Sequence, residues 1–184
     1  MFAHFIRLAA YLFLGGMLWA AEKPGVWLDV PFVAQEKNAC GAASIAMVMQ
    51  YWEIQQGKPV SANAKQIERL LYSPPANGIY ASDMKRYLEQ QGFRTFVFQG
   101  SWEDLKEHLE KGRPLIVALN ADRRNLHYVV VVGLDWTQGV VLKNDPAERK
   151  LLKQDRSSFE KQWKAAGNWT LLAVPQQSDN SSSQ

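Results

Sequence analysis

The order of the apolar patterns is the feature that most constrains the fold. Apolar residues recur with helical spacing at residues 39–51, 64–71, 82–91, 101–112 and 157–164, where helices are predicted. Alternating or continuous apolar runs predict strands at residues 93–98, 115–119, 127–134, 139–143 and 169–174. Helices dominate the first part and strands the second. This segregation predicts an α+β fold in which N-terminal helices pack on a mainly antiparallel sheet.

The two ends of the chain differ in composition from the part between them. Residues 1–21 combine a short basic end with an uncharged apolar run, which predicts a signal peptide cleaved after Ala20 or Ala21. An uncleaved membrane anchor is the alternative, and either reading predicts export to the periplasm or the cell exterior. The polar residues 176–184 predict a disordered tail. No repeat or long linker divides residues 22–175, so one domain is expected there.

Charge and cysteine content exclude several classes of protein. The chain has 184 residues, with 21 Lys and Arg and 18 Asp and Glu, and its net charge of +3 includes no long run of like charges. No nucleic-acid partner is therefore expected. A single cysteine excludes an internal disulfide and any multi-thiolate metal site, and the three histidines are scattered. Neither a metal nor an organic cofactor is predicted.

The single cysteine, Cys40, lies at the start of the first predicted helix, with Asn38 as the expected N-cap. Unpaired N–H groups and the positive end of the helix dipole favour a thiolate at this position. Gly41 keeps the approach to the sulfur open. A buried, inert thiol is the alternative, because free cysteine is often a core residue. The position at a helix N-terminus favours a reactive thiol.

A nucleophilic thiol needs a base, and His127 begins the strand predicted at residues 127–134. If the following turn centres on Trp136, an antiparallel hairpin pairs residue 127 with Asp145. Directly opposed residues share a face, so Asp145 is expected to orient the imidazole; a one-residue slip would place Asn144 there instead. Both Cys–His–Asp and Cys–His–Asn arrangements are chemically competent.

Gln35 precedes the cysteine by five residues and carries an uncharged amide. Together with the backbone N–H of Cys40, this amide could donate hydrogen bonds to the oxyanion of a tetrahedral intermediate. Such a donor contributes about 3 kcal/mol to transition-state stabilisation. By itself Gln35 is a weak signal, because glutamine is common on protein surfaces.

Four strings of the sequence, taken in order, closely resemble the C39-like papain-fold cysteine peptidases, a family that includes the bacteriocin-leader processing peptidase domains. These strings are Val30-Pro-Phe-Val-Ala-Gln35, Asn38-Ala-Cys40-Gly-Ala-Ala-Ser44, Leu126-His127-Tyr-Val-Val-Val and Asn144-Asp145-Pro146. The resemblance covers about residues 27–175. It implies a papain-like fold with Cys40 as nucleophile, His127 as base, Asp145 as the residue that orients the base, and Gln35 in the oxyanion hole.

The sequence departs from the family pattern in two ways. Ala42 stands where many members have proline, a change expected to have no functional consequence. The best-known members are fused to ABC transporters and cleave after paired glycines, whereas this chain carries an export signal and no transporter domain is expected in it. The double-glycine specificity is therefore not carried over.

The sequence predicts an exported cysteine peptidase that acts on a peptide or protein substrate. It is also expected to associate with the membrane if residues 1–21 are retained. Three alternatives stay open. The first is an acyltransferase or transpeptidase on the same fold, and the second is a peptide-binding C39-like module, although such modules lack the catalytic cysteine. The third is an exported structural protein whose thiol belongs to the core.

Overall fold

The computed structural model describes residues 24–120 and 126–176. These residues form an α+β fold around one antiparallel sheet whose strands differ in length. The strands follow the order β2-β7-β3-β4-β5-β6, and β1 pairs with β4 outside this path. Every strand pair is antiparallel. The strands are β1 (Gly25–Trp27), β2 (Phe93–Gln99), β3 (Leu115–Leu119), β4 (His127–Asp135), β5 (Val140–Asn144), β6 (Leu152–Asp155) and β7 (Trp169–Pro175).

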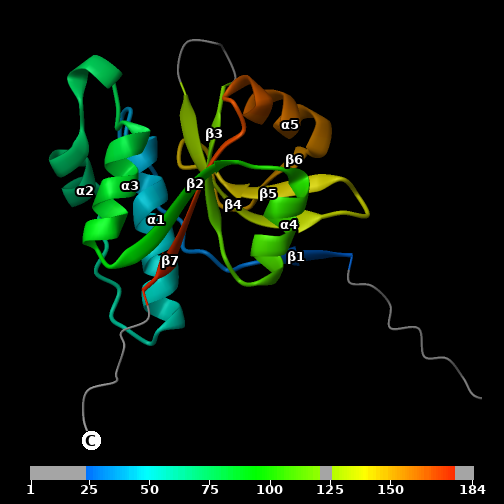
Figure 1. Ribbon diagram of the computed structural model, residues 1–184, viewed down its shortest axis with the longest axis horizontal. Helices are drawn as coiled ribbons and strands as arrows, with labels where there is room; N and C mark the ends of the chain where they lie inside the picture. The colour runs from blue at the N-terminus through cyan, green and yellow to red at the C-terminus, as the bar shows by residue number, and fades with distance from the viewer. Residues whose placement is uncertain (1–23, 121–125, 177–184) are drawn as a thin grey trace, which may run out of the picture.

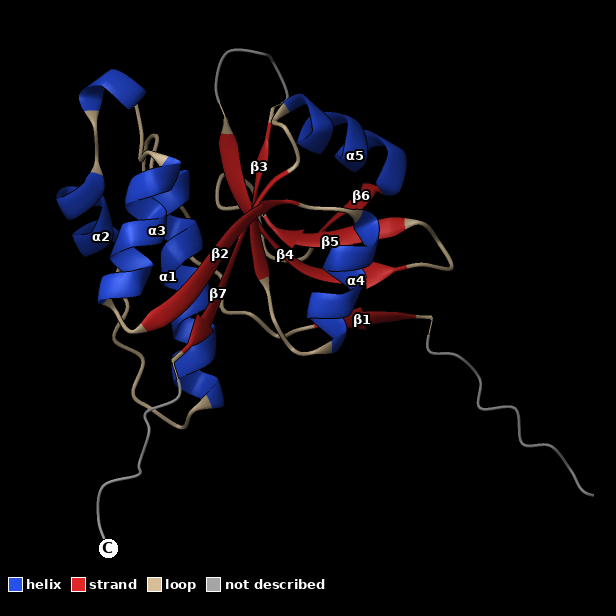
Figure 2. Cartoon of the chain, viewed as in Figure 1, coloured by secondary structure: helices blue, strands red, loops and turns tan. Residues whose placement is uncertain are grey.

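Helices cover the sheet on both faces. Figure 1 shows α1, α2 and α3 grouped on one side of the sheet and α4 and α5 on the other, and Figure 2 shows the strands between the two groups. The predicted packing of N-terminal helices on a mainly antiparallel sheet is confirmed. The helices are α1 (Cys40–Gln55), α2 (Ala64–Leu71), α3 (Ala81–Gln90), α4 (Trp102–Glu110) and α5 (Arg156–Ala165), with a short 3₁₀ helix, η1 (Pro74–Ala76).

Two hydrophobic cores share the central strands. In β3, Ile116 and Ala118 belong to the core under α1 to α3, whereas Leu115, Val117 and Leu119 belong to the core under α4 and α5. The valines of β4 alternate between the two cores in the same way. Because both faces are covered, these strands are apolar at almost every position, which explains their continuous apolar runs in the sequence.

Helix α1 is buried around most of its circumference, as its small residues predict. Ala42, Ile45 and Ala46 are fully buried. A methyl group added at Gly41 would lie 3.3 Å from Cβ of Ile79, so the glycine permits the close approach of the chain around residue 79. The helix therefore holds a fixed position between the sheet and the other N-terminal helices.

Helix caps were only partly predictable. Ser101 and Asp104 form the expected capping box of α4. The prediction of Asn38 as the cap of α1 is wrong: the cap is Ala39, and the side chain of Asn38 instead donates a hydrogen bond to Asn77. The short strands β1 and β6 and the 3₁₀ helix η1 were not predicted. Strand β6 has the sequence Leu-Lys-Gln-Asp, in which a single apolar residue gives no strand signal.

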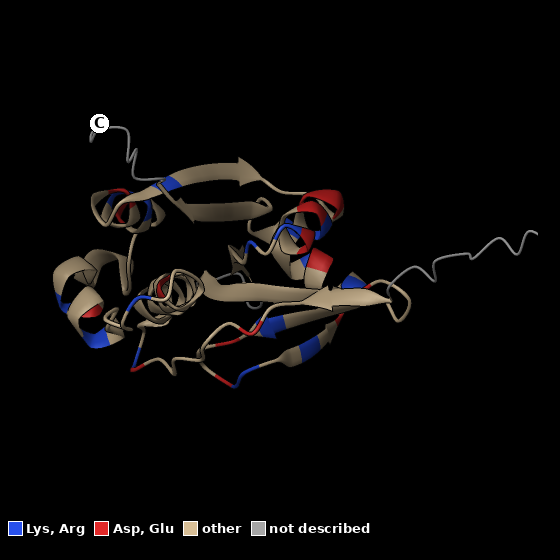
Figure 3. Ribbon diagram, turned by 90° about the horizontal axis from the view of Figure 1, so that it is seen from below, with Lys and Arg blue, Asp and Glu red and all other residues tan. Residues whose placement is uncertain are grey.

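Charged residues pair along the helices and do not gather by sign. Figure 3 shows basic and acidic residues interspersed on the outer helices. Several of these pairs have i,i+4 spacing, including Lys85 with Glu89 and Arg156 with Glu160. The interspersed charges agree with the mixed charge pattern of the sequence.

Residues 1–21, predicted as a signal peptide, lie outside the described part of the chain. The predicted tail, residues 176–184, also lies outside it except for Gln176. No helix among the described residues is long and apolar enough to cross a membrane.

Candidate active site

Cys40 is the first residue of α1 and is partly exposed. No side chain caps the first turn of the helix, whose N-cap residue is Ala39. The N–H groups of the first turn therefore remain available to stabilise negative charge on the sulfur. This environment differs from that of a buried core thiol and suits a nucleophile.

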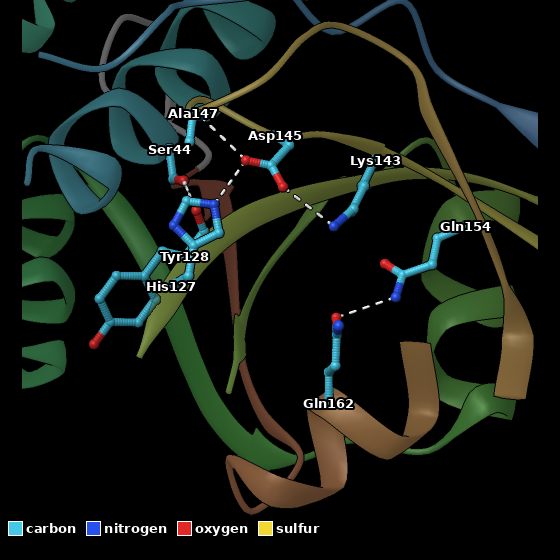
Figure 4. Close-up of polar contacts among 8 residues, drawn as sticks. All are labelled: Ser44, His127, Tyr128, Lys143, Asp145, Ala147, Gln154 and Gln162. Atoms are coloured by element: carbon cyan, nitrogen blue, oxygen red, sulfur yellow. Dashed lines mark hydrogen bonds and ion pairs between the residues drawn. The ribbon is translucent and has the colours of Figure 1, made fainter. Parts of the chain in front are cut away.

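His127 begins β4 and contacts both Cys40 and Asp145. Its Nε2 atom lies 2.7 Å from Oδ1 of Asp145, as Figure 4 shows. The thiol of Cys40 lies close enough to the imidazole to raise its pKa. Because Asp145 engages Nε2, Nδ1 is the ring nitrogen left for the sulfur. The structure thus brings a thiol, an imidazole and a carboxylate together in one chain of contacts.

The register expected for the β4–β5 hairpin is wrong. The ladder pairs Val130 with Asn144, and a bulge between Val131 and Gly133 shifts the register further toward the turn. Extended by one residue, this register places Asp145 across from Val129 and not across from His127. The shift is an even number of residues, so Asp145 stays on the face of His127 as a diagonal neighbour within reach of its ring.

Asn144, the alternative orienting residue, has a different role. It is fully buried, and its Nδ2 donates hydrogen bonds to the carbonyl oxygens of Val30 at 3.1 Å and Pro31 at 3.4 Å. Its Oδ1 accepts a hydrogen bond from the backbone N–H of Leu151 at 3.0 Å. Asn144 therefore ties the end of β5 to the segment that leads to Gln35.

Gln35 lines the same cleft as Cys40 and His127. Its backbone N–H donates a hydrogen bond to the carbonyl oxygen of Pro146 at 2.9 Å, directly after Asp145 in the chain. The side-chain Oε1 is buried and accepts no hydrogen bond from the described residues. The structure thus places Gln35 and Cys40 in the lining of one cleft.

The charges of the site stabilise one another. Burial by itself would lower the pKa of His127, but its hydrogen bonds to Asp145 and Cys40 and their negative charges raise that pKa to about 9. Burial would raise the pKa of Asp145, but the hydrogen bonds and positive charges of His127 and Lys143 lower it to about 2. At neutral pH the site therefore holds an imidazolium and a carboxylate.

Cys40 opens onto a cleft of about 470 Å³. Asn38 and Asn77 close one end through a 2.8 Å hydrogen bond, and both have the left-handed backbone conformation that asparagine tolerates, with φ of 61° and 48°. Tyr80 and Leu126 are exposed large hydrophobic residues on the cleft. Apart from His127, its lining among the described residues carries no charged side chain: Gln35, Asn38, Cys40, Ala76, Asn77, Gly78, Ile79, Tyr80, Ala81, Leu126, His127 and Tyr128.

Sequence reasoning missed the cleft wall and a second partner of Asp145. The contact between Asn38 and Asn77 has no signal in the sequence, because it depends on the loop around η1. The second partner is Lys143, whose Nζ lies 3.2 Å from Oδ2 of Asp145. A lysine in a strand is usually a solvent-exposed residue, so nothing in the sequence pattern singles out Lys143. No group of three His, Cys, Asp or Glu side chains in the described ranges could hold a metal ion.

Comparisons with known proteins point to one family. The model of the Peptidase_C39 like family matches residues 27–171. No curated protein is significantly similar to the chain in sequence.

Three solved structures share the fold at low sequence identity. A protein from Bacillus anthracis described as a C39-like peptidase is 21% identical, with a TM-score of 0.65 and coverage of 83% of this chain and 98% of that one. The peptidase domain of Streptococcus ComA, a bi-functional ABC transporter of a quorum-sensing pathway, is 22% identical, with a TM-score of 0.62 and coverage of 79% and 98%. A double glycine motif protease from an AMS/PCAT transporter, solved in complex with the leader peptide, is 21% identical, with a TM-score of 0.62 and coverage of 82% and 95%.

Proposed function

Because the chain belongs to the Peptidase_C39 like family, we propose that it is a cysteine peptidase that hydrolyses peptide bonds through Cys40, His127 and Asp145. One observation carries this proposal: the imidazole of His127 contacts both the thiol at the helix N-terminus and the buried carboxylate. Structural and binding proteins have no need for a paired thiol that opens onto a cleft.

The roles of the residues follow from their chemistry. The thiolate of Cys40 attacks the carbonyl carbon of the substrate, and a carbon–sulfur bond forms while the carbonyl oxygen becomes an oxyanion. The side-chain amide of Gln35 and the backbone N–H of Cys40 donate hydrogen bonds to that oxygen. The imidazolium of His127 gives its proton to the leaving amine as the carbon–nitrogen bond breaks. Neutral His127 then takes a proton from water, which hydrolyses the thioester and releases the acid.

A peptide is the substrate that fits the cleft. The cleft has amide groups at Gln35, Asn38 and Asn77, which can pair with a peptide backbone. Its exposed hydrophobic residues, Tyr80 and Leu126, favour uncharged apolar side chains near the bond to be cleaved. The AMS/PCAT protease, solved with its leader peptide, shows that this fold can hold a peptide.

The test is turnover of a peptide library by the purified protein, read by mass spectrometry. Cleavage is expected with the wild-type protein and lost by at least about a hundredfold in Cys40→Ala and His127→Ala, because the nucleophile and its base act as a unit. Thermal unfolding of the variants checks that the fold is kept. Equal cleavage by Cys40→Ala would contradict the proposal. Addition of acceptor amines distinguishes hydrolysis from acyl transfer, since an acyltransferase forms ligated products.

We also propose that residues 1–21 direct the protein to export, so that it acts on peptides outside the cytoplasm. The apolar run and the small residues at Ala20 and Ala21 support this proposal. Expression of the full chain in a bacterial host, followed by fractionation and N-terminal mass analysis, tests it. A mature form that begins at residue 21 or 22 in the periplasm is expected. A full-length form in the membrane fraction would indicate an uncleaved anchor, and a full-length cytoplasmic form would contradict export.

A further inference from the structure

Lys143 is a buried lysine in the middle of the molecule. It lies near the end of β5, and 5% of its surface is exposed. Lysine is almost never this buried unless its ammonium group is paired. Its Nζ atom lies 3.2 Å from Oδ2 of Asp145. The burial of this charge therefore depends on the same carboxylate that contacts His127.

The two oxygens of Asp145 are held from different sides, as Figure 4 shows. Oδ1 lies 2.7 Å from Nε2 of His127 and accepts a hydrogen bond from the backbone N–H of Ala147 at 3.1 Å. Oδ2 accepts a hydrogen bond from Lys143. Contacts on both oxygens fix the rotation of the carboxylate about its side-chain bonds. Without the contact on Oδ2, the carboxylate plane is held through Oδ1 alone.

The surroundings of Lys143 do not require a lysine for packing. It pairs with Val131 in the sheet, and on the same face Val141 and Val129 are buried apolar residues. An apolar side chain of similar volume would fill this position without the cost of burying an ammonium group. The presence of the charge therefore needs a reason other than core packing.

The region beside Lys143 suits its remaining donors. The β5–β6 ladder pairs Lys143 with Leu152 and Val141 with Gln154, so Lys143 and Gln154 lie on the same face. Figure 4 shows the amide of Gln154 on the side of Lys143 that faces away from Asp145. Its Nε2 donates a hydrogen bond to Gln162, and its buried Oε1 accepts none among the described residues. An ammonium group has three donors, so a polar neighbour here lowers the cost of its burial.

We propose that Lys143 is a positioning residue: it holds Oδ2 of Asp145 so that Oδ1 stays directed at Nε2 of His127. This inference rests on the proposed peptidase function, because it assigns to Lys143 the orientation of the residue that orients the base. Lys143 is not among the residues that line the cleft, and its side chain contacts Asp145. Its effect on the reaction therefore passes through Asp145 alone.

The charged groups around Asp145 set the sign of the expected pH effect. They are His127 on β4 and Lys143 on β5, and both lower the pKa of Asp145. Removal of the ammonium group raises that pKa but leaves Asp145 ionised at neutral pH, so what is lost is the hold on Oδ2 that keeps the carboxylate, and with it the imidazolium, in place. The imidazolium then lies less favourably beside the sulfur of Cys40, so alkylation is expected to need a higher pH than in the wild-type protein.

The first experiment measures the rate of Cys40 alkylation by iodoacetamide against pH in Lys143→Met. We expect alkylation at neutral pH to be roughly tenfold slower than in the wild-type protein, because small losses of orientation cost large factors in rate. We also expect the acid limb of the profile, the range in which the rate falls as the pH is lowered, to move to higher pH. Lys153→Met is the matched control, since Lys153 lies on the neighbouring strand and is exposed. It should leave both the rate and the limb unchanged. An unchanged profile in Lys143→Met would overturn the inference.

A double-mutant cycle separates positioning from a general structural role. If Lys143 acts through the carboxylate, Lys143→Met should slow alkylation much less in an Asp145→Asn background than in the wild-type background. Equal slowing in both backgrounds would contradict the inference. If Lys143→Met does not fold, Lys143→Gln gives the same test, because its amide also lacks the charge.

The same assay separates failure of this inference from failure of the proposed function. If alkylation of wild-type Cys40 does not respond to His127→Ala, there is no functional ion pair, and both proposals fail. If it responds to His127→Ala but not to Lys143→Met, only the role of Lys143 is wrong.

Discussion

At the residue scale, the imidazole ring of His127 connects Cys40 to the buried carboxylate of Asp145. Asp145 binds Nε2 of His127 from a position that is 3% exposed, whereas the other side of the ring faces the thiol in the cleft. This contact fixes the tautomer, so the proton of the neutral ring lies on Nε2 and Nδ1 is free to accept one. Sequence reasoning selected Asp145 correctly as the contact of His127, although the register it assumed was wrong.

The raised pKa of His127 makes folding stability depend on pH. The folded-state pKa is about 9, above the ordinary value of 6.5, so the folded protein binds this proton more tightly than the unfolded chain. The contribution is fully present below pH 6.5, decreases as the pH rises and is lost above about pH 9. Urea unfolding of the wild-type protein and of His127→Ala should show a stability difference that shrinks by on the order of 2 kcal/mol between pH 6 and pH 10.

The control for this titration is Asp145→Asn, in which the neutral amide no longer stabilises the imidazolium. Its stability should vary less with pH over the same window. A constant difference between the wild-type protein and His127→Ala at every pH would mean that the ring has an ordinary pKa.

At the scale of elements, the site depends on how the end of β5 is joined to the segment before α1. Elements with a regular apolar pattern and clear ends were predictable from sequence: β3 has the predicted bounds, and α2 does too. Strand β6 could not be predicted, because it has few apolar residues. The bulge in β4 could not be predicted either, because a bulge depends on how two strands pair and not on the sequence of one strand. The hydrogen bonds of Asn144 were also missed, because they join segments that are far apart in sequence.

Asn144→Ala should destabilise the protein and the site together. The substitution leaves the carbonyl oxygen of Val30 and the N–H of Leu151 without their partner, which should cost about 1–3 kcal/mol in the free energy of unfolding. It also frees the segment that carries Gln35, so peptide cleavage should fall even at temperatures where the variant is folded. Urea unfolding and the cleavage assay measure the two effects.

Ser101→Ala is the matched control for Asn144→Ala. It removes the cap of α4, whose buried residues belong to the other core, and should cost about 1 kcal/mol. Cleavage by folded Ser101→Ala should equal that of the wild-type protein. If the two variants lose activity in proportion to their stability, Asn144 has no specific role at the site.

At the scale of the whole molecule, β3 and β4 couple the two cores because alternate residues of the same strands enter each one. The segregation of helices and strands was sufficient to predict the fold class. It could not predict that α4 and α5 cover the second face, because an amphipathic helix carries no information about which face of a sheet it will meet. The cleft at the edge of this arrangement was also beyond prediction, since it depends on how separate elements meet.

Truncations in the two cores should therefore affect one common unfolding transition. Met84→Ala in the core under α1 to α3 and Leu109→Ala in the core under α4 and α5 each remove a fully buried side chain. Each should lower the free energy of unfolding by about 2–5 kcal/mol. Circular dichroism and tryptophan fluorescence should give the same midpoint for each variant. Separate midpoints by the two probes would show that the cores unfold independently.

The hydrogen bond from Gln35 N–H to the Pro146 carbonyl oxygen, at 2.9 Å, joins the donor side of the site to the side that orients the base. This contact couples the position of Gln35 to that of Asp145 in the protein without a substrate. If the protein is the peptidase proposed above, little substrate binding energy is consumed in assembling the site, unlike in enzymes that close around their substrates. Discrimination between peptides would then arise from how each one fits the existing cleft.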